Sequence, residues 1–253
     1  MIQALLARFG RALPIGLALC WAGAARASSI NVDPVLLELK PEAPTTLLDL
    51  RNQGTEPARL EISAFAWEES GAGEMKLSPT REVILFPPLL TLAPGEARQI
   101  RIGTTAPFGV DEKAFRVLVS ELPSAPRPGG GKPAITTVSQ FSIPLFLGAA
   151  HDTRVLHIQK LALSRRRLTF RLHTEGTVHL RPEEIRLAAV GEGGKVFEHR
   201  WSGWYLLPGG ERLYEIEVPK ATCVSLKRLE VEATLAGSVV TGTLEAGAGG
   251  CSD

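Results

Sequence analysis

The side chains that most often carry catalysis are sparse in this chain and poorly spaced for it. Glu68 and Glu69 are adjacent, so in a strand they point to opposite faces and make a poor acid–base pair. The chain has no Gly-x-Ser-x-Gly sequence, the turn that exposes the nucleophile of many hydrolases. No histidine is spaced as in HExxH or another zinc motif. The histidines are His151, His157, His173, His179 and His199. We expect no catalytic residue, no metal site and no cofactor.

Three short segments are candidates for ligand-binding sites that need no catalysis, but the third lacks the features such a site requires. Trp201 and Trp204 bracket a Ser-Gly pair and are either a sugar-binding face or ordinary packing residues. Arg165–Arg167 is a basic cluster, either a solvated turn or a contact for an anionic surface. Gly129–Gly131 lacks the following helix and the Gly-Lys-Ser/Thr sequence of a phosphate-binding loop.

The first 27 residues have the composition of a cleaved signal peptide. Arg8 and Arg11 precede an apolar run over residues 12–25, and Ala25-Arg26-Ala27 is a small-x-small cleavage site. The alternative is a membrane anchor, but the run is shorter than the roughly 20 residues that span a bilayer. We expect cleavage after Ala27, export, and no membrane insertion of the mature chain.

The expected cleavage changes both the number of cysteines and the net charge of the mature chain. Cleavage removes Cys20 and leaves Cys223 with Cys251, an even pair in an oxidising compartment, which predicts a disulfide. Two free thiols in a Gly-rich tail are the alternative. The precursor has 28 Lys and Arg against 27 Asp and Glu, and losing three arginines leaves the mature chain slightly acidic. This balance argues against binding to nucleic acid through bulk charge.

The elements that would position any site are strands. Period-two alternation with Gly and Pro turns recurs across the mature chain, and no long segment has a 3.6-residue period. The clearest strands are residues 45–50, 60–67, 99–103, 115–122, 155–163, 168–173, 185–190, 213–218 and 229–235. Short strands at this spacing predict an all-β fold of two tandem sandwiches, with residues 28–148 and 149–253 as the domains.

Two segments near the end of the first domain differ from the rest. Residues 123–133 are rich in Pro and Gly and predict an exposed mobile loop. Residues 134–147 then form an unusually long extended run, in which Pro144 requires an edge or a bulge because it cannot donate to a ladder.

Five motifs of the first domain resemble the periplasmic pilus-assembly chaperones, the PapD-like family. In chain order they are Ser29-Ile-Asn-Val-Asp-Pro-Val-Leu-Leu-Glu-Leu, Leu50-Arg-Asn-Gln-Gly, Phe86-Pro-Pro-Leu-Leu-Thr-Leu-Ala-Pro-Gly-Glu-Ala-Arg-Gln-Ile-Arg-Ile-Gly, Phe115-Arg-Val-Leu-Val-Ser-Glu-Leu-Pro and Ile143-Pro-Leu-Phe. The second half resembles the family only in length and β pattern. The resemblance implies two immunoglobulin-like domains in an L, located in the periplasm of a Gram-negative bacterium.

The resemblance also implies a way of binding pilus or fimbrial subunits. A subunit that lacks its last strand has an open core, and the chaperone completes it with its own long strand. Delivery to an outer-membrane usher would follow. The expected donor residues are Ile135, Thr137, Ser139, Phe141 and Ile143. The alternative for Ile135 and Phe141 is that they are core residues of an ordinary strand.

The chain departs from the family at the cations that clamp the subunit's terminal carboxylate. Leu36 and Pro144 occupy the matching positions, which places the chain nearer the archaic branch, whose long strand also ends in Ile-Pro-x-Phe. Arg116 is our candidate for the missing anchor, and a solvent-facing arginine is the alternative. Arg101 and Glu112 match an interdomain ion pair of the family, or else form a weak surface pair.

These observations predict an ATP-independent periplasmic chaperone rather than an enzyme. Its expected partners are pilus or fimbrial subunits and an outer-membrane usher. The alternative is a secreted two-domain adhesive or carbohydrate-binding protein that uses Trp201 and Trp204. An exported hydrolase is a more distant third.

Overall fold

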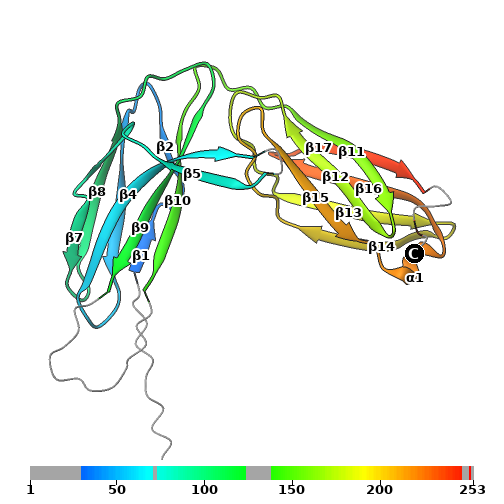
Figure 1. Cartoon of the computed structure of the whole chain (residues 1–253), viewed down its shortest axis with the longest axis horizontal. Helices are drawn as coiled ribbons and strands as arrows, with labels where there is room; N and C mark the ends of the chain where they lie inside the picture. Colours follow the sequence, from blue (N-terminus) through cyan, green and yellow to red (C-terminus); the bar gives the residue numbers. More distant parts are fainter. Residues whose placement is uncertain (1–29, 71–72, 124–137, 247–250, 252–253) are drawn as a thin grey trace, which may run out of the picture.

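The computed structural model describes residues 30–70, 73–123, 138–246 and 251, which form two groups of strands that meet at an angle (Figure 1). The first group is β1 (Ile30–Asp33), β2 (Leu37–Leu39), β3 (Thr45–Asn52), β4 (Ala58–Glu69), β5 (Met75–Pro79), β6 (Val83–Phe86), β7 (Leu89–Leu92), β8 (Ala97–Thr104), β9 (Lys113–Leu122) and β10 (Gln140–Leu147). The second is β11 (Leu156–Ser164), β12 (Arg167–Thr174), β13 (Glu184–Gly191), β14 (Gly194–Trp201), β15 (Glu211–Glu217), the short helix α1 (Lys220–Cys223), β16 (Leu226–Leu235) and β17 (Ser238–Glu245). The predicted all-β fold of two sandwiches is confirmed.

The first sandwich packs a sheet of order β1-β3-β8-β6 on a sheet of order β2-β10-β9-β4-β5, with β7 also paired to β4. The first segment of the described chain contributes to both sheets. Its first strand, β1, pairs with β3, whereas the next strand, β2, pairs with β10 in the other sheet. Alternate residues of the facing strands fill the core between the sheets, where burial of apolar side chains stabilises the fold. The most buried are Leu48, Leu50, Leu92, Ile100, Ile102, Val117, Val119 and Leu145.

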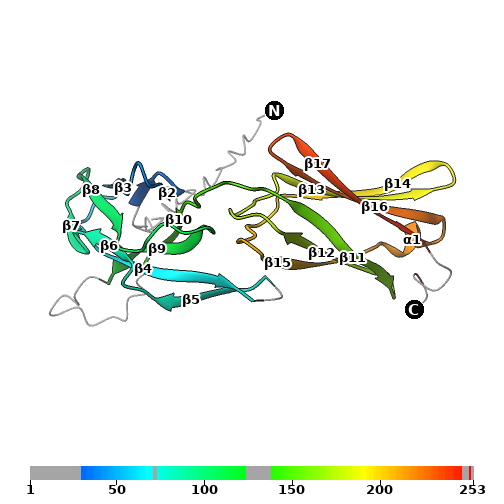
Figure 2. The ribbon, with the colours of Figure 1, turned by 90° about the horizontal axis from the view of Figure 1, so that it is seen from above.

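The second sandwich packs a sheet of order β11-β12-β15 on one of order β14-β13-β16-β17. Alternate residues of its strands again fill its core. Along β12, the buried Leu168, Phe170 and Leu172 alternate with more exposed residues. Leu229, Val231 and Ala233 do the same along β16. The β4–β5 hairpin extends from the first sandwich towards β15 of the second (Figure 2).

Two of the sequence motifs have a structural explanation. The turn between β7 and β8 contains Pro94 and Gly95, and Gly95 adopts a φ of +78°, which favours glycine. The buried Asn52 of the Leu50–Gly54 motif donates to the carbonyls of Leu92 (3.1 Å) and Glu56 (2.8 Å), so it ties the end of β3 to this turn.

The long extended run is the main difference from the predicted strands. Within the described residues its strand, β10, begins only at Gln140. Residues 134–137, the predicted loop from residue 124 onwards and the predicted signal peptide over 1–27 lie outside the described residues. None of the described helices is long and apolar enough to cross a membrane.

Candidate functional site

The contact between the two sandwiches is built on the outer face of the sheet that contains β9 and β10. On β9, Phe115 and Val117 point into the core, so Ala114 and Arg116 point outwards. The strand is nevertheless buried continuously from Ala114 to Val117, because its outer face meets the second domain. The apolar cluster between the domains contains Trp67, Ala114 and Phe146 from the first domain and Tyr205 and Leu207 from the second.

Arg116 lies within this contact and is only 4% exposed. Its guanidinium carbon stacks 3.8 Å above the Trp67 ring and lies 5.7 Å from the Tyr205 ring and 5.9 Å from the Trp204 ring. Its Nη1 donates to the carbonyl of Ser142 on β10, at 3.4 Å. Cation–π contact with tryptophan favours a guanidinium in such a place.

The buried guanidinium has an incomplete set of partners. Among the described residues, Nε and Nη2 of Arg116 and Nε1 of Trp67 have no hydrogen-bond acceptor. Burial lowers the pKa of Arg116, an effect that Tyr205 and Glu69 oppose. Buried N–H donors are normally paired, and an unpaired one costs roughly 1–3 kcal/mol. The arrangement is therefore chemically suited to accept an anion.

Glu69 attracts Arg116 but forms no hydrogen bond or close ion pair with it among the described residues, because its nearest contacts are with the second domain. Its side chain is 3% exposed, its Oε2 accepts from the Leu207 backbone N–H at 2.9 Å, and its Oε1 lies 3.6 Å from Nη2 of Arg212. Arg212 also donates to the carbonyl of Gly73, beyond the end of β4. Burial raises the pKa of Glu69, and the Leu207 amide and Arg212 oppose this.

Glu112 makes a second connection between the domains, but not with the predicted partner. Its Oε1 accepts from both the backbone N–H and Nδ1 of His179, at 3.0 and 2.8 Å. The His179 ring in turn stacks on Phe146, with ring centres 3.5 Å apart.

The predicted ion pair between Arg101 and Glu112 is wrong. Arg101 lies on β8 in the other sheet, opposite Leu47 of β3, and its exposed side chain has no ion-pair partner in the described part of the chain. That sheet does not form the interdomain contact, so Arg101 cannot contribute to it. The sequence does not reveal the role of His179, because an isolated histidine carries no motif.

The candidate donor residues divide into three groups. Ile143 is 4% exposed and belongs to the core of its own domain, which corrects the expectation that it is available to a partner. Phe141 is half-buried against the same core, and Ser139, also half-buried, precedes the strand. Ile135 and Thr137 lie outside the described residues.

The two ends of β10 differ in their pairing. Gln140–Leu147 pairs with β9 along its whole length, but β2 pairs only with Leu145–Leu147 on the other side. In the described part of the chain, residues 140–144 therefore have a neighbouring strand on one side only. Pro144 lies in this half-open stretch, directly opposite Arg116, in agreement with the edge position expected for a proline.

Trp201 and Trp204 have different surroundings rather than one shared face. Trp201, on β14, packs on the core of the second domain, 6.2 Å from the Tyr214 ring. Trp204 is 43% exposed and lies near Arg116 and edge-on to Tyr205.

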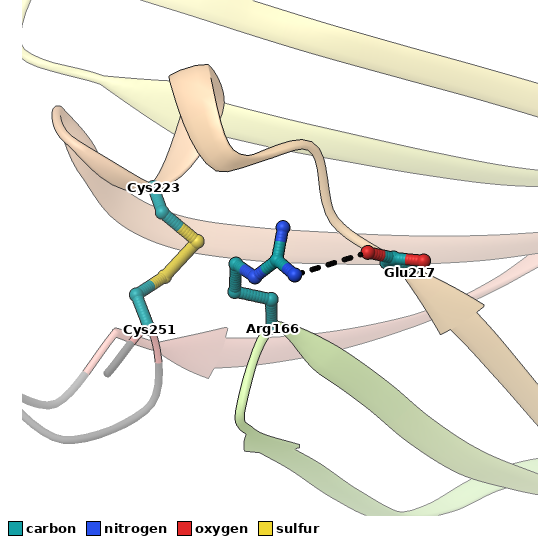
Figure 3. The surroundings of a disulfide bond; sticks show 4 residues. All are labelled: Arg166, Glu217, Cys223 and Cys251. Carbon is teal, nitrogen blue, oxygen red and sulfur yellow. Dashed lines mark ion pairs between the residues drawn. A yellow bond between two sulfur atoms is a disulfide. The ribbon is translucent and has the colours of Figure 1, made fainter. Parts of the chain in front are cut away.

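The cysteines lie far from this contact, at the other end of the second domain. Cys223 ends α1 and forms a disulfide with Cys251, with Cα atoms 5.7 Å apart. Arg166, from the turn between β11 and β12, lies beside the disulfide and pairs with Glu217 at 3.3 Å (Figure 3). The bond thus fastens the end of the chain to α1.

The chain thus has two β-sandwich domains, with a buried arginine at the contact between them. Residues 29–148 match the family model described as pili and flagellar-assembly chaperone, PapD N-terminal domain. That part of the chain is similar to this family, and the resemblance seen in the sequence is confirmed. A search of curated proteins finds no match.

Solved structures extend the likeness of fold to both domains. A chain in the CsuC–CsuE complex of chaperone and tip adhesion subunit, from archaic chaperone-usher Csu pili of Acinetobacter baumannii, matches with a TM-score of 0.56 at 17% identity, over 85% of this chain and 97% of that one. A chain in the complex of SafA pilin with the SafB chaperone of Salmonella enterica matches with a TM-score of 0.57 at 13% identity, over 87% and 99%. The CupB2 chaperone of Pseudomonas aeruginosa matches with a TM-score of 0.51 at 13% identity, over 85% and 100%.

Proposed function

We propose that this protein is a periplasmic chaperone that holds pilus or fimbrial subunits by donor-strand complementation and delivers them to an outer-membrane usher. The family of its first domain supports a role in pilus assembly. Two of the similar structures are complexes of a chaperone with a pilin or a tip subunit. Residues 1–27 support export.

The observation that carries the proposal is the half-open edge of β10. Residues 140–144 have β9 on one side and no described strand on the other. Backbone N–H and C=O groups at such an edge can form a ladder with a strand of another protein, whatever its side chains. A subunit that lacks one strand is the partner that gains most from this pairing, because the added strand closes its core.

We further propose that Arg116 binds the C-terminal carboxylate of the subunit. The family's clamp position on the long strand is occupied by Pro144, and Arg116 lies opposite it on β9. Paired residues of neighbouring strands point to the same face, so a cation is retained there although the clamp residue is lost. Its unpartnered Nε and Nη2 provide two donors for carboxylate oxygens.

Arg116→Ala should weaken subunit binding by about 2–5 kcal/mol, the usual cost of removing one partner of a buried charge pair. Titration calorimetry with a purified subunit measures this. Arg51→Ala is the matched control, because Arg51 is exposed on β3 of the opposite sheet. Equal affinity of the Arg116 variant and the wild type would contradict the anchor.

The proposal as a whole is tested by co-expressing the chain with a small secreted pilus subunit from the same organism. We expect a soluble 1:1 complex, and a ternary complex after addition of the usher's periplasmic domain. A chain that remains alone while the co-expressed protein aggregates contradicts the chaperone. Glycan binding by the chain alone would instead support the carbohydrate-binding alternative.

A further inference from the structure

We infer that Arg181, from the second domain, forms the other half of the carboxylate site, so that one terminal carboxylate is bound by a guanidinium from each domain. This inference rests on the proposed function and extends it. It names a binding residue in the domain whose sequence carries no family motif.

Arg181 is positioned by the backbone pairing of the residue before it and by a contact of its own side chain with Tyr205. The preceding residue, Leu180, exchanges two backbone hydrogen bonds with Leu206, at 2.9 and 2.8 Å. The Arg181 guanidinium carbon lies 5.3 Å from the centre of the Tyr205 ring. The guanidinium carbon of Arg116 lies 5.7 Å from the same ring. Two arginines from different domains therefore approach one buried tyrosine.

Neither arginine has an ion-pair partner among the described residues, and the hydrogen bonds and ion pairs of Glu69 and Glu112 are with other groups. Glu69 binds Leu207 and Arg212, and Glu112 binds His179. The two guanidinium carbons, 5.7 and 5.3 Å from the centre of the Tyr205 ring, belong to groups of like charge that repel each other, and an anion that contacts both offsets this repulsion. A carboxylate has two oxygens, each of which can accept from a planar guanidinium fork.

The two arginines differ in a way that suits capture of a chain end. Arg116 is buried and fixed against Trp67, whereas Arg181 is exposed and can reach an incoming group from solvent. Trp204, 43% exposed and 5.9 Å from the Arg116 guanidinium, marks the solvent side of the site. The apolar part of a terminal residue can pack on this ring.

The experiment uses the mature chain and two small probes, N-acetyl-phenylalanine and its amide, which differ only in the carboxylate. Binding is followed by the indole N–H signals of Trp67 and Trp204 in NMR titrations. The wild type should bind the acid about tenfold or more tightly than the amide. Arg181→Gln should reduce this preference about fivefold or more, and Arg116→Gln should remove it. Arg51→Gln, which changes an exposed arginine on β3 in the opposite sheet of the first domain, should leave it unchanged.

The outcomes separate this inference from the proposed anchor. A preference that is lost in Arg116→Gln but intact in Arg181→Gln overturns the role of Arg181 and leaves Arg116 as the anchor. Equal binding of acid and amide by the wild type, or binding of neither, overturns the carboxylate site at both arginines. Subunit capture at the edge of β10 would still be tested by co-expression.

Discussion

At the scale of single residues, two buried carboxylates of the first domain hold the second. Glu69 accepts the backbone N–H of Leu207, and Glu112 accepts that of His179. Each carboxylate thus satisfies a donor that would otherwise be buried without a partner. Leu207 and His179 lie two residues from Tyr205 and Arg181, respectively, so both contacts are close to the arginines discussed above.

The pKa of Glu69 provides a prediction for the dependence of stability on pH. Because burial raises this pKa, the folded chain keeps the proton at pH values where the unfolded chain has lost it. The contribution of Glu69 to the free energy of unfolding therefore falls as the pH rises from the ordinary pKa of 4.5 to the higher pKa of the folded chain. Glu69→Gln lacks this contribution. The melting temperature of the wild type relative to the variant should decline over this range, and parallel curves would contradict the assignment.

At the scale of elements, β10 has a closed end and an open end. Leu145–Leu147 lies between β2 and β9, and all three side chains are buried. The opposite end has one neighbouring strand and half-buried or exposed side chains, apart from Ile143 and Pro144. One strand can therefore anchor itself in its own domain and still offer an edge.

Two substitutions in β10 distinguish its role in the core of its own domain from its proposed role in binding a subunit. Ile143→Ala should lower the free energy of unfolding of the free chain by about 2–4 kcal/mol, because it leaves a cavity in a packed core. Phe141→Ala, at the open end, should cost the free chain less and the subunit complex more. Urea unfolding and subunit titration measure both effects. If Phe141→Ala changes folding stability alone, the residue belongs only to the core of its own domain.

At the scale of the whole molecule, the angle between the domains is part of the proposed binding site. The cluster of Trp67, Ala114, Phe146, Tyr205 and Leu207 forms the contact, and the two carboxylates lie at its border. The carboxylate site needs an arginine from each domain, so it exists only while this contact persists.

Glu112→Ala should loosen that angle, because it leaves the backbone N–H and Nδ1 of His179 without their acceptor. Small-angle X-ray scattering should show a broader distribution of distances between the domains. Glu82→Ala is the control, since Glu82 pairs with Lys113 inside the first domain. Identical scattering from the two variants would mean that Glu112 does not hold the domains together.

The features that could be predicted from the sequence are those that depend on a local pattern of residues. Alternation located the buried strands, and Pro94-Gly95 located a turn. It did not resolve β14 as a separate strand, since this edge strand has exposed residues on both faces and so lacks a clear period. The Arg101 pairing failed because the partner of Glu112 lies 67 residues further along the chain in another domain. No local pattern brings Arg116, Tyr205 and Arg181 together.

Hydrogen exchange of the β10 amides, with and without bound subunit, tests the central claim most directly. Donor-strand pairing predicts that the amides of residues 140–143 facing the open edge become strongly protected in the complex. Those of Leu145–Leu147, already paired on both sides, should change little. A stable 1:1 complex in which residues 140–143 exchange as fast as in the free chain would contradict the account.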